Sequence, residues 1–239
     1  MVNESPEEIY SSLKNVWPEN NNWYDYTHRC IIDFVMESLT KRLNKDSIYL
    51  NAGSGGSAYN LLGTCHHVDI VENLIKKFPR HAVASIENLP YPDSSFDALI
   101  CVGSVINYCD VVKSIGELSR VLKPEGVLIL KYERSNTGEL WFNKDYGKGA
   151  SLQQYQYLGH THTLWLYSEQ IVDQLLKENS LITLKRKRFH CMSALVNRIF
   201  NNEKLSGRFG CIDILFQPIS YSIAHNIILL SQKSTINIG

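Results

Sequence analysis

The chain has 239 residues, 44% of them hydrophobic, and its 24 basic and 24 acidic residues give a formal net charge of zero. This length favours one domain over residues 1–239, and without a basic field we expect no nucleic-acid partner. No apolar stretch approaches the ~18 residues that span a bilayer. The six scattered cysteines form no Cys-x-x-Cys pair, which is typical of reduced thiols. We therefore expect a cytoplasmic monomer or homodimer with no membrane span and no metal site.

The first 45 residues predict a helical cap. Apolar residues recur at spacing four over residues 5–18, and a continuous apolar stripe over residues 27–43 predicts a second helix. Between these two segments lies Trp-Tyr-Asp-Tyr at positions 23–26, which we expect to form an aromatic loop.

From residue 46 onward, strands and helices alternate. We expect strands at 47–51, 65–69, 81–84, 97–102, 126–132, 181–189 and 225–232, and helices near 55–62, 71–78, 110–122, 168–179 and 192–205. Near-continuous apolar strands that alternate with helices predict an α/β fold whose mostly parallel sheet is covered on both faces. Residues 134–165 interrupt this alternation with Gly, Gln, Tyr and His, and they predict an insertion or lid.

A glycine-rich loop follows the first predicted strand. Residues 48–58 read Ile-Tyr-Leu-Asn-Ala-Gly-Ser-Gly-Gly-Ser-Ala. Glycine has no Cβ, so such a loop brings backbone amides close to a ligand. Asp69 ends the next strand, where a carboxylate can hold the two hydroxyls of a ribose. The pattern fits both dinucleotide-binding folds and methyltransferases that use S-adenosylmethionine (SAM), so an NAD(P)-dependent oxidoreductase stays open at this point.

Two later segments favour one of these classes. Residues 87–97, Glu-Asn-Leu-Pro-Tyr-Pro-Asp-Ser-Ser-Phe-Asp, precede the fourth strand, and residues 120–126, Arg-Val-Leu-Lys-Pro-Glu-Gly, precede the fifth. Together with the glycine loop they resemble the class I SAM-dependent methyltransferases, in the group similar to the quinone-biosynthesis methyltransferases. The resemblance covers residues 46–133 well and 165–190 more loosely.

This resemblance implies a Rossmann-like sheet of seven strands, with an antiparallel last strand and an insertion after strand 5. It also implies a division of the single domain into a SAM-binding half, residues 46–133, and a substrate-side half, residues 134–239. The last strand is expected at 225–232, because it closely follows an apolar segment with no long crossover helix between them.

The resemblance also implies cofactor contacts at matching positions. These are Asn51, Gly53, Gly55, Gly56, Asp69, Ile70, Ser85, Ile86, Glu87, Cys101, Val102 and Gly103. The family usually has an acidic residue where this chain has Asn51, and Asp where it has Ser85. Both differences remove negative charge from the expected cofactor site, so a non-catalytic, methyltransferase-like binding or scaffold protein is the alternative.

Methyl transfer from a sulfonium is an in-line displacement, in which the protein aligns the reactants and excludes water. We expect SAM as cofactor, S-adenosylhomocysteine as product, and a small or medium organic acceptor. A general base is needed only if the acceptor must lose a proton. His160 and His162 share one face of an extended segment and are candidates for acceptor binding or proton removal. Tyr26 and Arg29 are candidates to cap the cofactor and to meet its carboxylate.

Two further clusters have structural explanations. Residues 65–67, Cys-His-His, lie in a predicted strand, where neighbours point to opposite faces and cannot converge on a metal. Residues 185–188, Lys-Arg-Lys-Arg, fall in a late strand, where charges commonly protect an exposed sheet edge.

Overall fold

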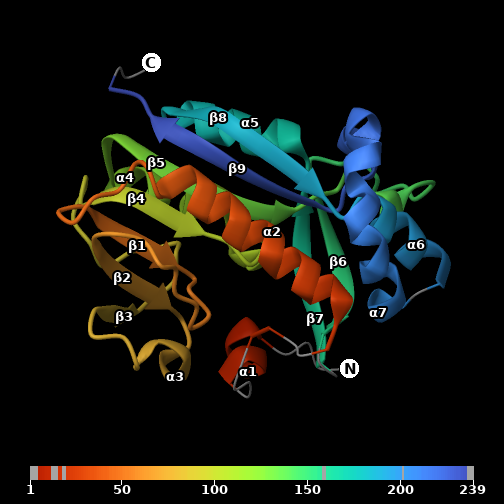
Figure 1. Cartoon of the computed structure of the whole chain (residues 1–239), viewed down its shortest axis with the longest axis horizontal. Helices are drawn as coiled ribbons and strands as arrows, with labels where there is room; N and C mark the ends of the chain where they lie inside the picture. The colour runs from red at the N-terminus through yellow and green to blue at the C-terminus, as the bar shows by residue number, and fades with distance from the viewer. Residues whose placement is uncertain (1–4, 12–15, 18–19, 158–159, 201, 236–239) are drawn as a thin grey trace.

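A seven-stranded sheet forms the centre of the computed structural model, which describes residues 5–11, 16–17, 20–157, 160–200 and 202–235 (Figure 1). Its strands, in the spatial order β3-β2-β1-β4-β5-β9-β8, are β3 (His81–Val83), β2 (Thr64–Asp69), β1 (Ile48–Ala52), β4 (Phe96–Cys101), β5 (Leu122–Glu133), β9 (Asn226–Lys233) and β8 (Leu181–Phe189). The pairs among β1 to β5 are parallel, whereas β9 runs antiparallel to both β5 and β8. The predicted fold class, with its antiparallel last strand, is confirmed.

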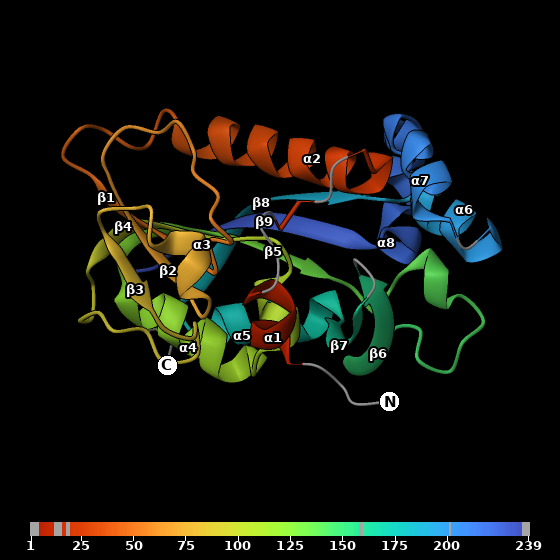
Figure 2. The ribbon, with the colours of Figure 1, turned by 90° about the horizontal axis from the view of Figure 1, so that it is seen from below.

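Helices cover both faces of this sheet (Figure 2). Helix α2 (Asn22–Leu39) packs on one face, and α4 (Val111–Val121) and α5 (Glu169–Glu178) pack on the other. Alternation along β5 explains this arrangement, because Val127 and Ile129 contact the α2 side while Leu128 and Leu130 contact the opposite side. The short helix α3 (Glu72–Ile75) follows β2.

The N-terminal cap differs from its prediction. Helix α1 covers Pro6–Ser11, and residues 12–15 of the predicted helix lie outside the described residues. Helix α2 begins at Asn22, because the Asn21 side chain accepts a hydrogen bond from the backbone N–H of Trp23 at 3.0 Å. The expected aromatic loop at residues 23–26 is therefore the first turn of a helix.

The helix predicted at residues 55–62 is also wrong, since this segment forms turns and irregular backbone. Gly53, Gly55 and Gly56 have φ angles of +66°, +53° and +76°, which interrupt a right-handed helix. The Asn51 side chain instead holds the far end of the loop by donating to the carbonyl of Ser57 at 2.9 Å.

Residues 134–165 contain a β-hairpin, whose strands are β6 (Ala150–Tyr157) and β7 (His160–Tyr167). The segment after β4 contains η1 (Val105–Tyr108). The helices of the second half are η2 (Gly138–Leu140), α6 (Met192–Phe200), α7 (Glu203–Ser206), η3 (Gly207–Ile219) and α8 (Ser220–Ile223). The helix predicted at 192–205 is thus divided into α6 and α7. Among the described residues, no helix has the length and apolarity that crossing a membrane requires.

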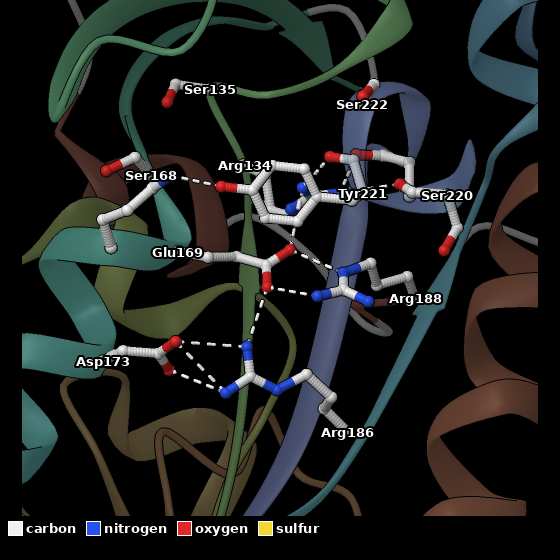
Figure 3. A network of polar contacts seen from close by, with 12 residues as sticks. Arg134, Ser135, Ser168, Glu169, Asp173, Arg186, Arg188, Ser220, Tyr221 and Ser222 are labelled. Carbon is white, nitrogen blue, oxygen red and sulfur yellow. Dashed lines mark hydrogen bonds and ion pairs between the residues drawn. The ribbon is translucent and has the colours of Figure 1, made fainter. Parts of the chain in front are cut away.

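A buried ion-pair network joins the sheet edge to α5 (Figure 3). Strand β8 lies at the edge of the sheet, as its basic run predicts. Glu169 at the start of α5 accepts from Arg134, Arg186 and Arg188 at 2.8, 2.9 and 2.7 Å. Arg134 directly follows β5 and also donates to the carbonyl of Ala224 at 2.8 Å. The network therefore fixes the end of β5 against both α5 and the segment before β9.

Candidate functional site

A cavity of about 220 Å³ lies at the carboxyl ends of the parallel strands. Its walls come from the glycine loop after β1, the segments after β2, β3 and β4, and the cap formed by α1 and α2. The end of β5, the start of β9 and the β6–β7 hairpin close its other side. Ligands of open α/β sheets bind in this position, outside the carboxyl ends of the strands.

The glycine loop forms one wall through Gly53 and Gly55. A Cβ at Gly53 would lie 2.5 Å from Cγ2 of Val105, so only glycine allows this approach. Gly56 lies outside the cavity wall, and a Cβ there would lie 2.9 Å from the carbonyl oxygen of Leu74. Asn51 is buried behind the loop and does not line the cavity.

Asp69 stands at the end of β2 and lines the cavity together with Ile70. Its Oδ2 accepts from the N–H of Gly55 at 2.8 Å, and its Oδ1 accepts from the N–H of Val71 at 3.0 Å. Burial raises the pKa of Asp69, and these backbone hydrogen bonds oppose that rise. Each carboxylate oxygen has a second lone pair, so the side chain can still accept from two ribose hydroxyls.

Ser85 and Ile86 line the cavity after β3, whereas the neighbouring Glu87 does not. The Glu87 carboxylate turns away and accepts from the backbone N–H of Asp110 at 2.7 Å. Asp110 is the N-cap of α4, so Glu87 supports the start of that helix and the expected cofactor contact is not supported.

Val102 and Gly103 line the cavity after β4, but Cys101 packs into the core on the α4 side of the sheet. Cys101 belongs to a strand, and alternation turns its side chain away from the cap. A Cβ added at Gly103 would meet nothing within 4 Å, so open space lies beside this backbone.

Aromatic side chains form the cap: Tyr10, Trp17, Trp23 and Tyr24 all line the cavity. Tyr26 and Arg29 do not, contrary to expectation. The Tyr26 hydroxyl donates to Asp213 at 3.1 Å, and Arg29 is exposed to solvent. Because residues 22–39 form a helix and not a loop, these two side chains point away from the face that covers the cavity.

The two candidate histidines separate along β7. His162 is buried and lines the cavity, and its Nδ1 shares a hydrogen bond of 2.7 Å with the Tyr108 hydroxyl. Burial lowers the pKa of His162. His160 lies two residues nearer the hairpin turn, opposite Tyr157, and does not line the cavity.

Four charged or titratable residues at the far end of the cavity were not found from the sequence: Lys131, Glu133, Glu139 and His225. Lys131 and Glu133 interrupt the apolar pattern where β5 ends, which is the one sequence signal that marks them. The others lie in η2 and just before β9, and no spacing links them. Within the described part of the chain, no three His, Cys, Asp or Glu side chains are placed to hold a metal ion.

Comparisons with known proteins agree with this geometry. A family model described as a methyltransferase domain matches residues 50–130. A 2-phytyl-1,4-naphtoquinone methyltransferase of Nostoc punctiforme is 29% identical over 160 residues, which cover 59% of this chain and 69% of that protein. The family match and these relatives together support a methyltransferase domain of the class I SAM-dependent type over residues 50–130. A ubiquinone/menaquinone biosynthesis C-methyltransferase of Rickettsia akari is 39% identical over 84 residues, which span 35% of this chain and only 33% of the relative.

Solved structures share the fold of this chain. An S-adenosylmethionine-dependent methyltransferase structure from Listeria monocytogenes superposes with a TM-score of 0.62 at 11% identity, over 86% of this chain and 99% of that one. The structure of the [4+2]-cyclase SpnF superposes with a TM-score of 0.61 at 14% identity, over 98% of both chains. At these identities the likeness establishes the fold and leaves the reaction to be argued from the site.

Proposed function

We propose that this protein transfers the methyl group of SAM to a small organic acceptor. The observation that carries the proposal is the continuity of one cavity, which joins a glycine loop and Asp69 to a polar pocket past the end of β4. Cofactor and acceptor would then meet beside Val102 and Gly103.

The residues present fit an adenosyl cofactor. Asp69 has acceptor capacity for ribose hydroxyls, and Gly53 and Gly55 bring backbone within reach of the methionine part. Ser85 and Ile86 offer a hydroxyl and an apolar surface to an adenine ring. The open space beside Gly103 leaves room for a sulfonium group. Asn51 lies behind the loop and does not line the cavity, so having Asn there in place of an acidic residue does not change the cavity wall.

The cofactor, when bound, supplies an already activated methyl group. The chain's own residues then align the acceptor and keep water out, which supplies much of the rate enhancement in such transfers. Tyr10, Trp17 and Trp23 cover the cavity and perform the second task. An acceptor would be held by the polar groups of β5, β7 and the start of β9.

The test is a transfer assay with methyl-labelled SAM and a panel of small alcohols, phenols, amines and quinols. Label is expected in at least one organic product. Asp69→Asn, which keeps the size but removes the charge, is expected to weaken S-adenosylhomocysteine binding by about tenfold or more. Retained binding without transfer to any acceptor would favour a non-catalytic binding protein instead.

A further inference from the structure

Four titratable side chains, Lys131, Glu133, His225 and Glu139, form a row along the acceptor end of the cavity. Lys131 Nζ lies 3.6 Å from Glu133 Oε1, and Glu133 Oε2 lies 3.3 Å from His225 Nε2. On its other side, His225 Nδ1 lies 3.4 Å from Glu139 Oε2. All four residues line the cavity, although their side chains are largely buried.

Glu133 is rigidly placed beside the end of β4. Its backbone N–H donates to Asn107 Oδ1 at 3.0 Å, and its carbonyl accepts from Asn107 Nδ2 at 3.1 Å. Its carboxylate accepts from the Ser104 hydroxyl at 2.7 Å, and Ser104 has a left-handed backbone with φ of +66° directly after Gly103. The carboxylate is therefore fixed next to the position proposed for the sulfonium.

His225 is held by a carboxylate at each ring nitrogen. A neutral imidazole has one N–H and one lone pair, so one of its nitrogens would direct a lone pair at a carboxylate. Burial lowers the pKa of His225, but Glu139 and Glu133 raise it by a larger amount, against a smaller opposing effect of Lys131. The two carboxylates thus give this imidazole a high affinity for a proton.

We propose that Glu133 and His225 accept the proton that a small hydroxyl- or amine-bearing acceptor loses as it is methylated. This inference rests on the proposed function and specifies its substrate class. The acceptor's O–H or N–H binds the Glu133 carboxylate, and its heteroatom lone pair forms the new bond to the methyl carbon. The carbon–sulfur bond breaks, its electron pair stays on sulfur, and the proton passes through Glu133 Oε2 to the lone pair on Nε2 of neutral His225. Glu139 touches neither reactant and acts as a positioning residue.

His162 is the competing base, and the two candidates differ in pH dependence. Burial lowers the pKa of His162, so its imidazole would stay neutral and could act as a base at pH values below about 6.5, the ordinary pKa of histidine. The pair Glu133–His225 becomes a base only when His225 is neutral, which requires a pH above about 6.5. The half-maximal point of kcat/KM against pH therefore distinguishes them.

Several other groups can influence that half-maximal point. Lys131 and Glu133 face His225 from β5, Glu139 from η2 and Tyr155 from β6. The pKa of His190, which follows β8, is lowered partly through His225. Glu139 is the best position for a substitution, because it makes the largest contribution that raises the pKa of His225 and it lies away from Glu133.

The experiment measures kcat/KM against pH with labelled SAM and a panel of phenols, hydroxy acids and amines, each paired with its fully methylated analogue. The wild type is expected to methylate only members with an exchangeable proton, with a half-maximal point above about 6.5. Glu139→Gln should move that point down by roughly one unit, because a negative charge beside the imidazole is lost. Glu133→Gln should lower kcat by about 100-fold or more.

Two matched variants and one direct measurement complete the design. Glu37→Gln removes an equal charge from the surface of α2 and should leave the profile unchanged. His162→Gln should leave the half-maximal point in place. NMR titration of labelled histidines in the S-adenosylhomocysteine complex should show His225 losing its proton above a pH of about 6.5, and at lower pH in Glu139→Gln.

The proposal is overturned by a half-maximal point below about 6.5 that Glu139→Gln does not move, or by no turnover of any panel member with an exchangeable proton. Methylation of a quinol carbon with such a profile would contradict this inference while leaving the proposed function intact. Failure of the wild type to bind S-adenosylhomocysteine would instead contradict the proposed function itself.

Discussion

Gly53 shows most directly how a single residue shapes the site. Its φ of +66°, together with the 2.5 Å that would separate an added Cβ from Val105, excludes any larger side chain. The resemblance to SAM-dependent methyltransferases implied Gly53, Gly55, Asp69, Ile70, Ser85, Ile86, Val102 and Gly103 as cofactor contacts, and the extended segment around residue 162 suggested His162. All of these residues line the cavity.

Gly53→Ala should therefore weaken S-adenosylhomocysteine binding by about tenfold or more, since the left-handed backbone alone costs about 1–2 kcal/mol. Calorimetric titration measures the loss. Adding Val105→Ala should recover the steric part and leave the backbone part. Gly116→Ala is the control. Gly116 lies within α4, and a Cβ added there would have only Asn179 Oδ1 near it, at 3.8 Å. Equal affinity for Gly53→Ala and the wild type would contradict a cofactor at this loop.

Other site residues could not be predicted because they depend on contacts between distant segments. Glu133, Glu139 and His225 come from β5, η2 and the segment before β9, which lie together only in the folded chain. The prediction that Tyr26 and Arg29 contact the cofactor depends on a loop at residues 23–26. In the structure this segment is the start of helix α2, with Asn21 as its N-cap, so both side chains point away from the cavity.

Among the elements, the junction of β5, β8 and α5 depends on Glu169. Three arginines surround its carboxylate, and the Glu169 and Arg134 side chains are 2% and 0% exposed. Burial raises the pKa of Glu169, but Arg188, Arg134 and Arg186 lower it by more. A buried carboxylate in this setting is costly to neutralise, because three guanidinium groups would lose their partner.

Glu169→Gln should lower the free energy of unfolding by about 3–5 kcal/mol, measured by urea denaturation. The pKa of Glu169 is lower in the folded state, so its contribution is present above the unfolded pKa of about 4.3 and is lost as pH falls below it. Acid should therefore destabilise the wild type more than the variant. Asp173→Asn, at a carboxylate that is 38% exposed, should cost only about 0–1 kcal/mol. Equal costs for both variants would contradict this account.

For the whole molecule, the cavity is closed by parts that lie far apart in the sequence. The Tyr10 hydroxyl of α1 lies 3.2 Å from that of Tyr108 in η1, which bonds to His162 of β7. The alternation of apolar strands and helices predicted the sheet beneath. It did not predict this closure, because residues 134–165 carry no periodic pattern that reveals where a hairpin packs.

Tyr10→Phe removes the hydrogen bond between the Tyr10 and Tyr108 hydroxyls. Release of S-adenosylhomocysteine should therefore become about 2- to 10-fold faster, which corresponds to the net contribution of one hydrogen bond. Stopped-flow fluorescence of the cavity tryptophans would measure that rate. Tyr146→Phe, which removes a hydrogen bond to the Ser222 carbonyl away from the cavity wall, is the control. An unchanged release rate would show that α1 does not close over the cofactor.

Calorimetric titration with S-adenosylhomocysteine, with NAD as the control ligand, tests the central claim most directly. The account predicts binding of one S-adenosylhomocysteine per chain in the micromolar range, no binding of NAD, and a loss of about tenfold or more in Asp69→Asn. Absence of binding at millimolar S-adenosylhomocysteine by a folded protein would contradict the cofactor assignment and the methyl transfer derived from it.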